Sequence, residues 1–382
     1  MARNAGVRQV VTLGALVAAF AWAEPAGGVE PPARPKMSAF YVGNWLLDNS
    51  MPPFHDELGQ SAGREWSVGV RSDLGLMLYM DLYSFAKDWA YGDTDVWTTA
   101  GRGKLKKVFE ERPWDALVVQ PSGWIGLHRG GEQMGPWYRE QMSDDLKTDD
   151  FGDVASASAL FRFFLERHPG GELIVFEGLP ELETETGPDG ALVMQDTAAG
   201  PEPAPDREGF DYVRHWETVR YDPAQGEGGR TSGTRDYTRQ LMEGLKACFP
   251  EKWNDGNLCC IPVGEVYNVI EKRIRAGKFP APDGVTSFYS DTVHQRTGLP
   301  RYVIAATMYA VLFQDRPHAL DWSLYNDSDA YGQLGGPNWF YAHVPDFGEH
   351  LPITAELAEA ANDVIWDVVT GHPYAGVGTA SE

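Results

Sequence analysis

Five short apolar segments alternate with longer stretches of helical periodicity, and this alternation limits the folds that the chain can adopt. The segments are rich in β-branched and aromatic residues and are apolar at successive positions, which is typical of parallel strands covered on both faces. They span residues 38–44, 66–70, 115–120, 172–178 and 257–263. Helical patterns lie at residues 103–113, 154–171, 234–250, 263–277, 299–314 and 353–371. We therefore expect a three-layer α/β/α sandwich around a parallel five-stranded sheet.

The N-terminal residues 1–23 have the pattern of a secretory signal peptide. Two arginines precede an apolar run at residues 10–23, which ends in a small-x-small cleavage sequence. The run is short for a membrane span. We expect a cleaved signal peptide, a Pro- and Gly-rich linker at residues 24–36, and a mature protein that is secreted or periplasmic and not held in a membrane. An uncleaved N-terminal anchor is the alternative.

The chain is strongly acidic. It has 32 Lys and Arg against 55 Asp and Glu, a net charge of −23, and loss of the two arginines in residues 1–23 would make it −25. Such a surface repels nucleic acid and anionic lipid, and the sequence has no basic stripe. We therefore expect no nucleic-acid partner.

One region interrupts the alternation. Residues 181–233 lack sustained periodicity and are rich in Gly, Pro and acidic residues. We interpret them as a long insertion into a single domain at residues 37–376, lying over the carboxyl edge of the sheet. Insertions of this length are usually lids, binding loops or mobile segments. The aromatic-rich part at residues 210–221 is expected to fold back on the core.

The three cysteines are Cys248, Cys259 and Cys260. Export permits a disulfide from Cys248 to either member of the adjacent pair. Burial of the cysteines as plain apolar residues is the other option. Adjacent cysteines rarely both reach one zinc ion, so we expect no metal and no other cofactor.

The most specific chemical signal is the pattern D-x-x-H formed by Asp291 and His294, just before the apolar stretch 299–314. An acid at this spacing can reach the imidazole, fix its tautomer and stabilise the imidazolium, as in the base half of a hydrolytic triad. A solvated loop that contains an acid and a histidine by chance is the alternative. His55 and His215 could reach the same edge, but each is expected to be an ordinary surface or core histidine.

Three blocks, in chain order, resemble the SGNH/GDSL-type hydrolases: YVGNWLLDN at 41–49, WDALVVQPSG at 114–123 and DTVHQRTGLPRYVIAATMYAVLF at 291–313. The first is most similar to variants that read Gly-Asn-Ser-Leu-Thr-Asp-Asn. The resemblance covers most of residues 37–314. It implies a flavodoxin-like sheet, the SGNH hydrolase fold, and an extracytoplasmic esterase or deacetylase. The ligand that it implies is a small ester, an acetylated saccharide or another glycan.

The first block departs from the family at two positions. Trp45 stands in place of the serine nucleophile and Leu47 in place of the threonine, whereas Asp48 and Asn49 match. An indole N–H can only donate a hydrogen bond and cannot act as a nucleophile. Loss of the serine from a triad costs about a million-fold in rate. We expect the Trp45 indole to occupy the crevice beside the imidazole of His294.

The resemblance also implies groups that bind an oxyanion. The family's asparagine is missing from the middle block, and Gln120 is the nearest amide that could replace it. Backbone N–H groups at the end of the first strand are the other expected donors. The candidate for the glycine of the family's second block lies in RSDLGL. The residues expected to form the cleft are Gly43, Asn44, Trp45, Asp48, Gly75 and Gln120.

Three hypotheses about function remain. In the first, a degenerate hydrolase fold binds a glycan, for which the 13 tryptophans could supply aromatic platforms, although most are expected in the core. In the second, ester hydrolysis uses Ser50, Ser72 or Ser122 as nucleophile, or a water molecule activated by His294. In the third, the chain shares only a fold with the hydrolases, and a fold does not determine function.

Overall fold

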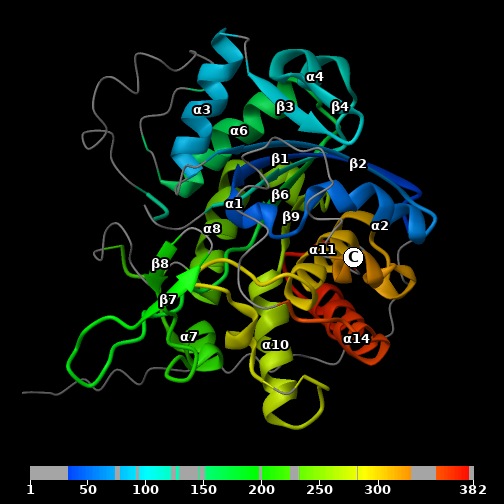
Figure 1. The fold of residues 1–382 in the computed structure, drawn as a ribbon. Helices are drawn as coiled ribbons and strands as arrows, with labels where there is room; N and C mark the ends of the chain where they lie inside the picture. The colour runs from blue at the N-terminus through cyan, green and yellow to red at the C-terminus, as the bar shows by residue number, and fades with distance from the viewer. Residues whose placement is uncertain are drawn as a thin grey trace, which may run out of the picture.

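The computed structural model describes residues 33–73, 78–91, 94–121, 126–128, 146, 150, 152–197, 200–223, 231, 233–281, 283–327 and 350–377 (Figure 1). The strands are β1 (Lys36–Asn44), β2 (Glu65–Asp73), β3 (Asp95–Thr98), β4 (Gly101–Lys104), β5 (Ala116–Val119), β6 (Glu172–Phe176), β7 (Met194–Thr197), β8 (Gly200–Pro203) and β9 (Leu258–Ile261). The helices are α1 (Trp45–Asp48), α2 (His55–Ser61), α3 (Leu78–Tyr91), α4 (Leu105–Glu111), α6 (Asp153–Arg167), α7 (Tyr212–Thr218), α8 (Arg235–Cys248), α9 (Pro250–Asn254), α10 (Val263–Arg275), α11 (Leu299–Phe313) and α14 (Ala355–Gly371).

The centre of the fold is a seven-stranded, mostly parallel sheet with the order β4-β3-β2-β1-β5-β6-β9. The strands β2, β1, β5, β6 and β9 are parallel, and each comes from one of the five predicted segments. β3 is antiparallel to β2, and β4 is antiparallel to β3. The expectation of a five-stranded parallel sheet is therefore wrong at one edge, where a hairpin adds two strands.

This edge hairpin carries little strand signal in the sequence. β4 reads Gly-Arg-Gly-Lys and is mostly exposed, so neither composition nor alternation marks it. Gly101 supports the turn, because its φ of 108° lies in the region that favours glycine. The helix predicted over 103–113 begins instead at Leu105, since the two residues before it belong to β4.

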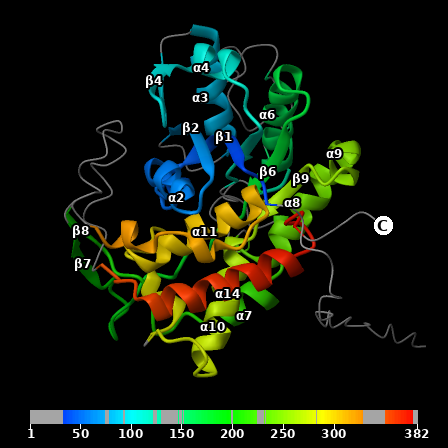
Figure 2. The same cartoon turned by 90° about the vertical axis from the view of Figure 1, so that its right-hand side faces the viewer.

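Side chains of the parallel strands alternate between two cores, and helices cover both faces of the sheet (Figure 2). In β1, Tyr41 belongs to the core that includes residues of α2, α10, α11 and α14. Phe40 and Val42 belong to the core that includes residues of α3, α4, α6 and α8. All three side chains are fully buried. Burial on both faces explains why the predicted segments are apolar at successive positions.

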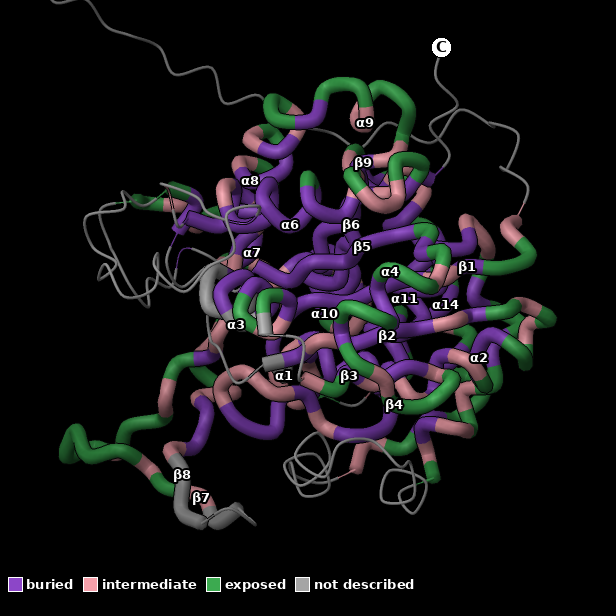
Figure 3. Tube along the Cα trace, turned by 90° about the horizontal axis from the view of Figure 1, so that it is seen from above, coloured by how far each residue is buried: buried purple, intermediate pink, exposed green. Residues whose placement is uncertain are grey.

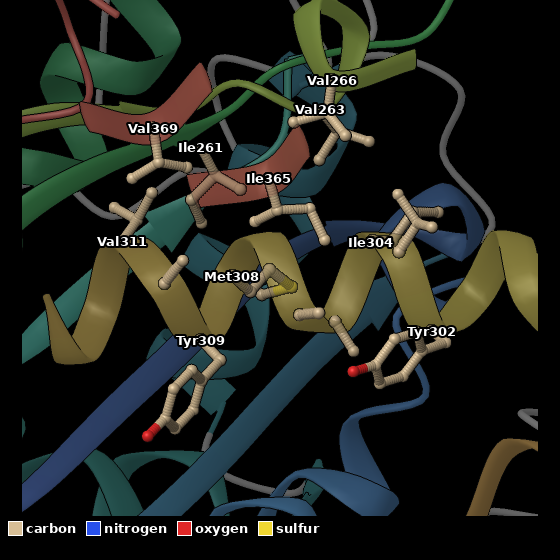
Figure 4. Packing of buried hydrophobic residues seen from close by; sticks show 14 of the residues in the cluster. Ile261, Val263, Val266, Tyr302, Ile304, Met308, Tyr309, Val311, Ile365 and Val369 are labelled. Atoms are coloured by element: carbon tan, nitrogen blue, oxygen red, sulfur yellow. The ribbon is translucent and has the colours of Figure 1, made fainter. Parts of the chain in front are cut away.

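Helix α11 is buried along its whole length. Figure 4 shows Ile304 and Val311 on the side of α11 that faces Ile365 and Val369 of α14, while Tyr309 lies on the opposite side. A helix that is apolar all round must be covered all round. The loop that leads into α11 therefore has one firmly held end, and that loop carries Asp291 and His294.

The insertion at 181–233 contains the hairpin β7–β8 and helix α7. In Figure 3 the exposed segment that leads into β7 extends away from the main body, and Leu192 within it is half exposed. In contrast, Tyr212 and Trp216 of α7 are fully buried. Trp216 lies so close to Gly264 that a Cβ there would be 2.1 Å from the ring. The prediction that residues 210–221 fold back on the core is confirmed.

The cysteines, all within the described residues, are free thiols. Cys259 and Cys260 are buried on opposite faces of β9, and burial raises the pKa of both thiols. Cys248 is exposed near the end of α8. The prediction that cysteines are buried as apolar residues is therefore confirmed for Cys259 and Cys260, and Cys248 forms no disulfide with either of them.

The predicted signal peptide lies outside the described residues, as does most of the linker. Across the segments that the structure describes, no helix combines the length and apolarity that a membrane span requires.

Candidate active site

The reversal of strand order at β1 creates the candidate site. The five parallel strands have the doubly wound order 2-1-3-4-5, because β1 lies between β2 and β5. In such sheets a ligand binds beyond the carboxyl ends of the strands, where the order reverses. Gly43 and Asn44 end β1, Ser72 lies near the end of β2, and Gln120 directly follows β5. The fold therefore brings these predicted site residues to one edge of the sheet.

Gln120 joins the end of β5 to the first block. Its Oε1 accepts hydrogen bonds from the backbone N–H of Asn44 at 3.3 Å and of Leu47 at 2.8 Å. This close approach requires a glycine at position 43, since a Cβ there would lie 2.8 Å from the Cβ of Gln120. The Nε2 of Gln120 is buried and has no hydrogen-bond partner among the described residues. A buried amide donor without a partner is costly, and such groups occur at functional sites.

Asn44 caps the short helix α1. Its Oδ1 accepts a hydrogen bond from the backbone N–H of Leu46 at 2.9 Å. The N–H groups of Asn44, Leu46 and Leu47 are thus all engaged by side chains. The expectation that backbone N–H groups at the end of the first strand bind an oxyanion is not met at Asn44. Gln120 Nε2 remains as a candidate donor.

Asp291 and His294 form the contact that their spacing predicts. The Nδ1 of His294 lies 2.5 Å from Asp291 Oδ2, and the backbone N–H groups of Val293 and His294 donate to Oδ1 at 2.7 Å. Burial raises the pKa of Asp291, but the hydrogen bonds from the imidazole and the two N–H groups outweigh it and lower the pKa overall. An ionised carboxylate only accepts hydrogen bonds, so Nδ1 donates to Asp291, and in the neutral form of the imidazole the lone pair lies on Nε2.

The Asp–His loop is attached to the first block through the residue after His294. The backbone N–H of Gln295 donates to Asn49 Oδ1 at 3.3 Å, across 246 residues of sequence. The carbonyl of Gln295 accepts hydrogen bonds from Arg301 Nε at 3.1 Å and Nη2 at 3.0 Å. The backbone N–H and the backbone carbonyl of Gln295 are therefore both held, which restrains the backbone beside His294.

Sequence reasoning missed the role of Arg301. Its side chain is almost fully buried although it belongs to the most apolar helix of the chain. An arginine within such a helix was the available signal, because a buried charge needs hydrogen-bond partners.

Asp48 is buried on the β2 side of the site. Its Oδ2 accepts a hydrogen bond from Ser72 Oγ at 3.1 Å, and its Oδ1 has no hydrogen-bond partner in the described part of the chain. Burial raises the pKa of Asp48 well above its ordinary value, against the lowering effects of the Ser72 hydroxyl and the Arg301 charge. Burial therefore shifts the balance at Asp48 toward the protonated form.

The described candidate nucleophiles are both engaged in local structure. Ser50 is fully buried, and its hydroxyl donates to the carbonyl of Leu47 at 2.9 Å. Ser72 is also buried and donates to Asp48. A substrate cannot reach either hydroxyl in this conformation. Ser122, Gly75 and the side chain of Trp45 lie outside the described residues.

His55 belongs to the core and not to the site. Its ring stacks on Trp66 at a centroid distance of 4.1 Å. Trp66 Nε1 donates to the Tyr41 hydroxyl, which donates in turn to His55 Nδ1 at 3.1 Å, and His55 Nε2 donates to the carbonyl of Ser50 at 3.0 Å. Burial lowers the pKa of His55 to about 3, against the raising effect of the Ser50 carbonyl. The imidazole is therefore neutral near pH 7.

A buried acid that the sequence did not mark follows β6. Glu177 is almost fully buried, and its Oε2 accepts a hydrogen bond from the backbone N–H of Glu265 at 3.2 Å. The carboxylate of Glu265 is paired with Arg235. Burial and, second, the charge of Glu265 raise the pKa of Glu177 to about 8.

Glu177 is expected to make folding stability fall as pH rises. Its pKa rises from 4.5 in the unfolded chain to about 8 in the fold, so the native state binds the extra proton between these values. We expect a loss of about 3 kcal/mol between pH 5 and pH 7.5 from this group, at 1.36 kcal/mol per pKa unit. The free energy of unfolding, measured in urea, should lose this pH dependence in Glu177→Gln. It should keep the pH dependence in Glu166→Gln, which changes an exposed acid of α6. Identical pH profiles for wild type and Glu177→Gln would contradict the assignment.

Within the described residues, no group of three His, Cys, Asp or Glu side chains is arranged to hold a metal ion. No family model matches the chain, and no curated protein matches it. Among solved structures, the chain is similar to a DUF4886 family protein from Bacteroides uniformis. The two share 12% sequence identity and a TM-score of 0.45, over 87% of this chain and 95% of that chain. A similarity at this level carries no inference about function.

Proposed function

We propose that this protein is an exported ester hydrolase with the three-layer α/β/α sandwich and flavodoxin-like strand order of the SGNH-type hydrolases. In this proposal His294 is the general base, Asp291 orients it, and a water molecule replaces the missing serine. The substrate is a small ester or an acetylated saccharide. The order of the five parallel strands and the ordered sequence blocks support the family assignment. The signal-like sequence at residues 1–23 supports export.

The observation that carries the proposal is the geometry of the Asp–His pair. Asp291 uses one oxygen to hold the imidazole of His294 and the other to accept two backbone N–H groups. The imidazole therefore has one tautomer and little freedom to rotate, which is what a general base requires. The imidazole and carboxylate side chains are 17% and 12% exposed, so the pair lies close to the surface and is not sealed in the core.

The chemistry then proceeds without a covalent intermediate. His294 Nε2 takes a proton from water as the water oxygen adds to the acyl carbon of the ester, and the carbonyl oxygen becomes an oxyanion. The amide of Gln120 is the proposed oxyanion donor, because its Nε2 has no hydrogen-bond partner among the described residues. The amide is buried in this conformation, so this role requires the crevice to open at Gln120 when the ester binds. The intermediate then collapses, and the imidazolium returns its proton to the leaving alkoxide, which yields an acid and an alcohol.

Removal of the imidazole tests this function. His294→Ala is expected to lower the hydrolysis of aryl acetates and acetylated sugars by about 10²- to 10⁴-fold, the usual contribution of a positioned general base. His318→Ala is the matched control, because His318 makes a comparable contact with Asp363 at 3.0 Å on the surface. The measurement is the initial rate of ester hydrolysis by purified wild type, His294→Ala and His318→Ala. Hydrolysis that is absent from wild type, or that survives His294→Ala, would exclude the proposal.

Glycan binding without turnover is the second candidate function. It is favoured by one observation: the hydroxyls of Ser50 and Ser72 are buried and engaged elsewhere. A hydrolase fold that lacks an accessible nucleophile can keep its crevice as a binding site. This candidate predicts glycan binding that is micromolar or tighter and that weakens on Trp45→Ala, with no ester hydrolysis. A glycan screen without any binding would count against it.

A further inference from the structure

One part of the insertion, residues 182–207, lies beside the loop that carries the Asp–His pair (Figure 1) and is hydrogen-bonded to it. Arg207 Nη2 donates to the carbonyl of Ser290 at 2.9 Å and to that of Tyr289 at 3.0 Å. Gln195 Nε2, in β7, also donates to the carbonyl of Ser290, at 3.2 Å. Tyr289 and Ser290 are the two residues before Asp291. The insertion is thus bonded to the site and does not merely cover it.

A further contact from the insertion orients one of the groups that hold Asp291. The carbonyl of Thr292 and the N–H of Val293 belong to one peptide unit, which is planar and trans, so the two groups point in opposite directions. The carbonyl accepts a hydrogen bond from the backbone N–H of Leu182, in the insertion, at 2.8 Å. The N–H donates to Asp291 Oδ1 at 2.7 Å. One side of this peptide unit is held by the insertion and the other holds the carboxylate.

A second peptide unit repeats this arrangement. The carbonyl of Tyr289 accepts from Arg207, while the N–H of Ser290, in the same unit, donates to the carbonyl of His294 at 2.9 Å. The carbonyl side of this peptide unit is therefore bonded to the Arg207 guanidinium, and its N–H side closes the loop onto the carbonyl of His294. Hydrogen bonds that involve a charged donor are stronger than those between neutral groups. The hydrogen bonds of Arg207 are therefore expected to be stronger than those that Gln195 and the backbone of Leu182 donate to the same loop.

The electrostatic surroundings of Arg207 agree with this role. The side chain is half-buried, and burial followed by the charge of Arg296 lowers the pKa of Arg207. Asp291 and Glu185 oppose this effect. The charge of the Asp291 carboxylate therefore favours the charged form of Arg207, which donates to the two carbonyls before Asp291.

We propose that Arg207 is a positioning residue for the Asp291–His294 pair, and that the insertion acts as a brace for this pair. The inference deepens the proposed function, on which its catalytic meaning rests. The brace holds the loop on both sides of Asp291: Arg207 bonds the carbonyls of the two residues before it, and Leu182 bonds the peptide unit whose N–H, that of Val293, donates to its carboxylate. Through Asp291 the brace restrains the imidazole of His294. A ligand that displaces the insertion would therefore alter the base without touching it.

The experiment compares Arg207→Gln and Arg207→Lys with Arg220→Gln by amide hydrogen exchange and proton NMR. Arg220 is the matched control, because it is an exposed arginine of the same insertion whose guanidinium donates to a carbonyl within the insertion, that of Glu217, at 3.0 Å. In Arg207→Gln, exchange of the Val293 and His294 amide protons should accelerate about tenfold, the value of one net hydrogen bond. The signal of the His294 Nδ1 proton should broaden. Arg207→Lys should restore part of the protection, because it keeps the charge and one donor.

The amides of β5 serve as the check on global stability and should exchange as in wild type. If the proposed hydrolysis operates, Arg207→Gln should lower kcat about tenfold with little change in KM. The exchange measurement does not need turnover, so it tests the brace even if the hydrolysis proposal fails. Unchanged exchange at Val293 and His294 in Arg207→Gln, or equal acceleration in Arg220→Gln, would overturn the inference.

Discussion

Replacing Trp45 with serine is expected to raise ester hydrolysis by at least about 10³-fold. Loss of the serine from a complete triad costs about 10⁶-fold, and a serine restored to a site that lacked one should recover part of this factor. Position 45 begins α1 at the carboxyl end of β1, between Asn44 and Leu46, whose N–H groups are both held. The backbone at this position is therefore already fixed.

The same segment is hydrogen-bonded to the residue that follows His294. Asn49, four residues after position 45, accepts the hydrogen bond from Gln295, which directly follows His294. Initial rates with aryl acetates measure the gain. Trp45→Ala is the control, because it removes the indole without adding a nucleophile. The double variant Trp45→Ser, His294→Ala should lose the gain. If Trp45→Ser were no more active than Trp45→Ala, the SGNH assignment of this site would fail.

Acidification is expected to destabilise the protein strongly through His55. The pKa of this imidazole falls from 6.5 in the unfolded chain to about 3 in the fold, because the ring is buried. The unfolded state therefore binds the extra proton between these values, and stability is lost as pH falls from 6.5 toward 3. The loss from this group is about 5 kcal/mol, at 1.36 kcal/mol per pKa unit. Such a loss is comparable to the whole stability of many domains.

Urea unfolding between pH 7 and pH 4 measures this effect. His55→Gln removes the titrating group and should flatten the acid side of the stability profile, although loss of the stack on Trp66 will lower stability at pH 7. His318→Gln, which changes a surface histidine, should leave the profile unchanged. An acid limb of equal steepness in His55→Gln and wild type would show that the buried imidazole is not its cause.

Several features of the fold were predictable because their causes are local. The five parallel strands were found because both faces of each are buried, so the residues are apolar at successive positions, as in Ala39 to Val42. The Asp291–His294 contact was predictable because its two members are three residues apart in one turn. The hairpin β3–β4 was missed, because the Gly-Arg-Gly-Lys strand at the sheet edge needs no apolar residues.

The supporting contacts of the site were not predictable, because each joins distant segments. Asn49 meets Gln295 across 246 residues, and Arg207 meets Tyr289 across 82. No periodicity or spacing relates such residues. Gln120 was predicted as a possible oxyanion donor, but the hydrogen bonds by which its carbonyl oxygen holds the backbone of the first block were not predictable, because they depend on the distance between β1 and β5.

The sequence by itself therefore determined the alternation of strands and helices and the contact between Asp291 and His294. These follow from residue type and from separations of a few residues, which the backbone geometry of a turn or strand converts into contacts. The tertiary structure alone decided which groups hold the pair in place. Hydrogen bonds have nearly fixed lengths and directions, so Asn49, Arg301 and Arg207 can act on the loop only after the sheet, α11 and the insertion have packed.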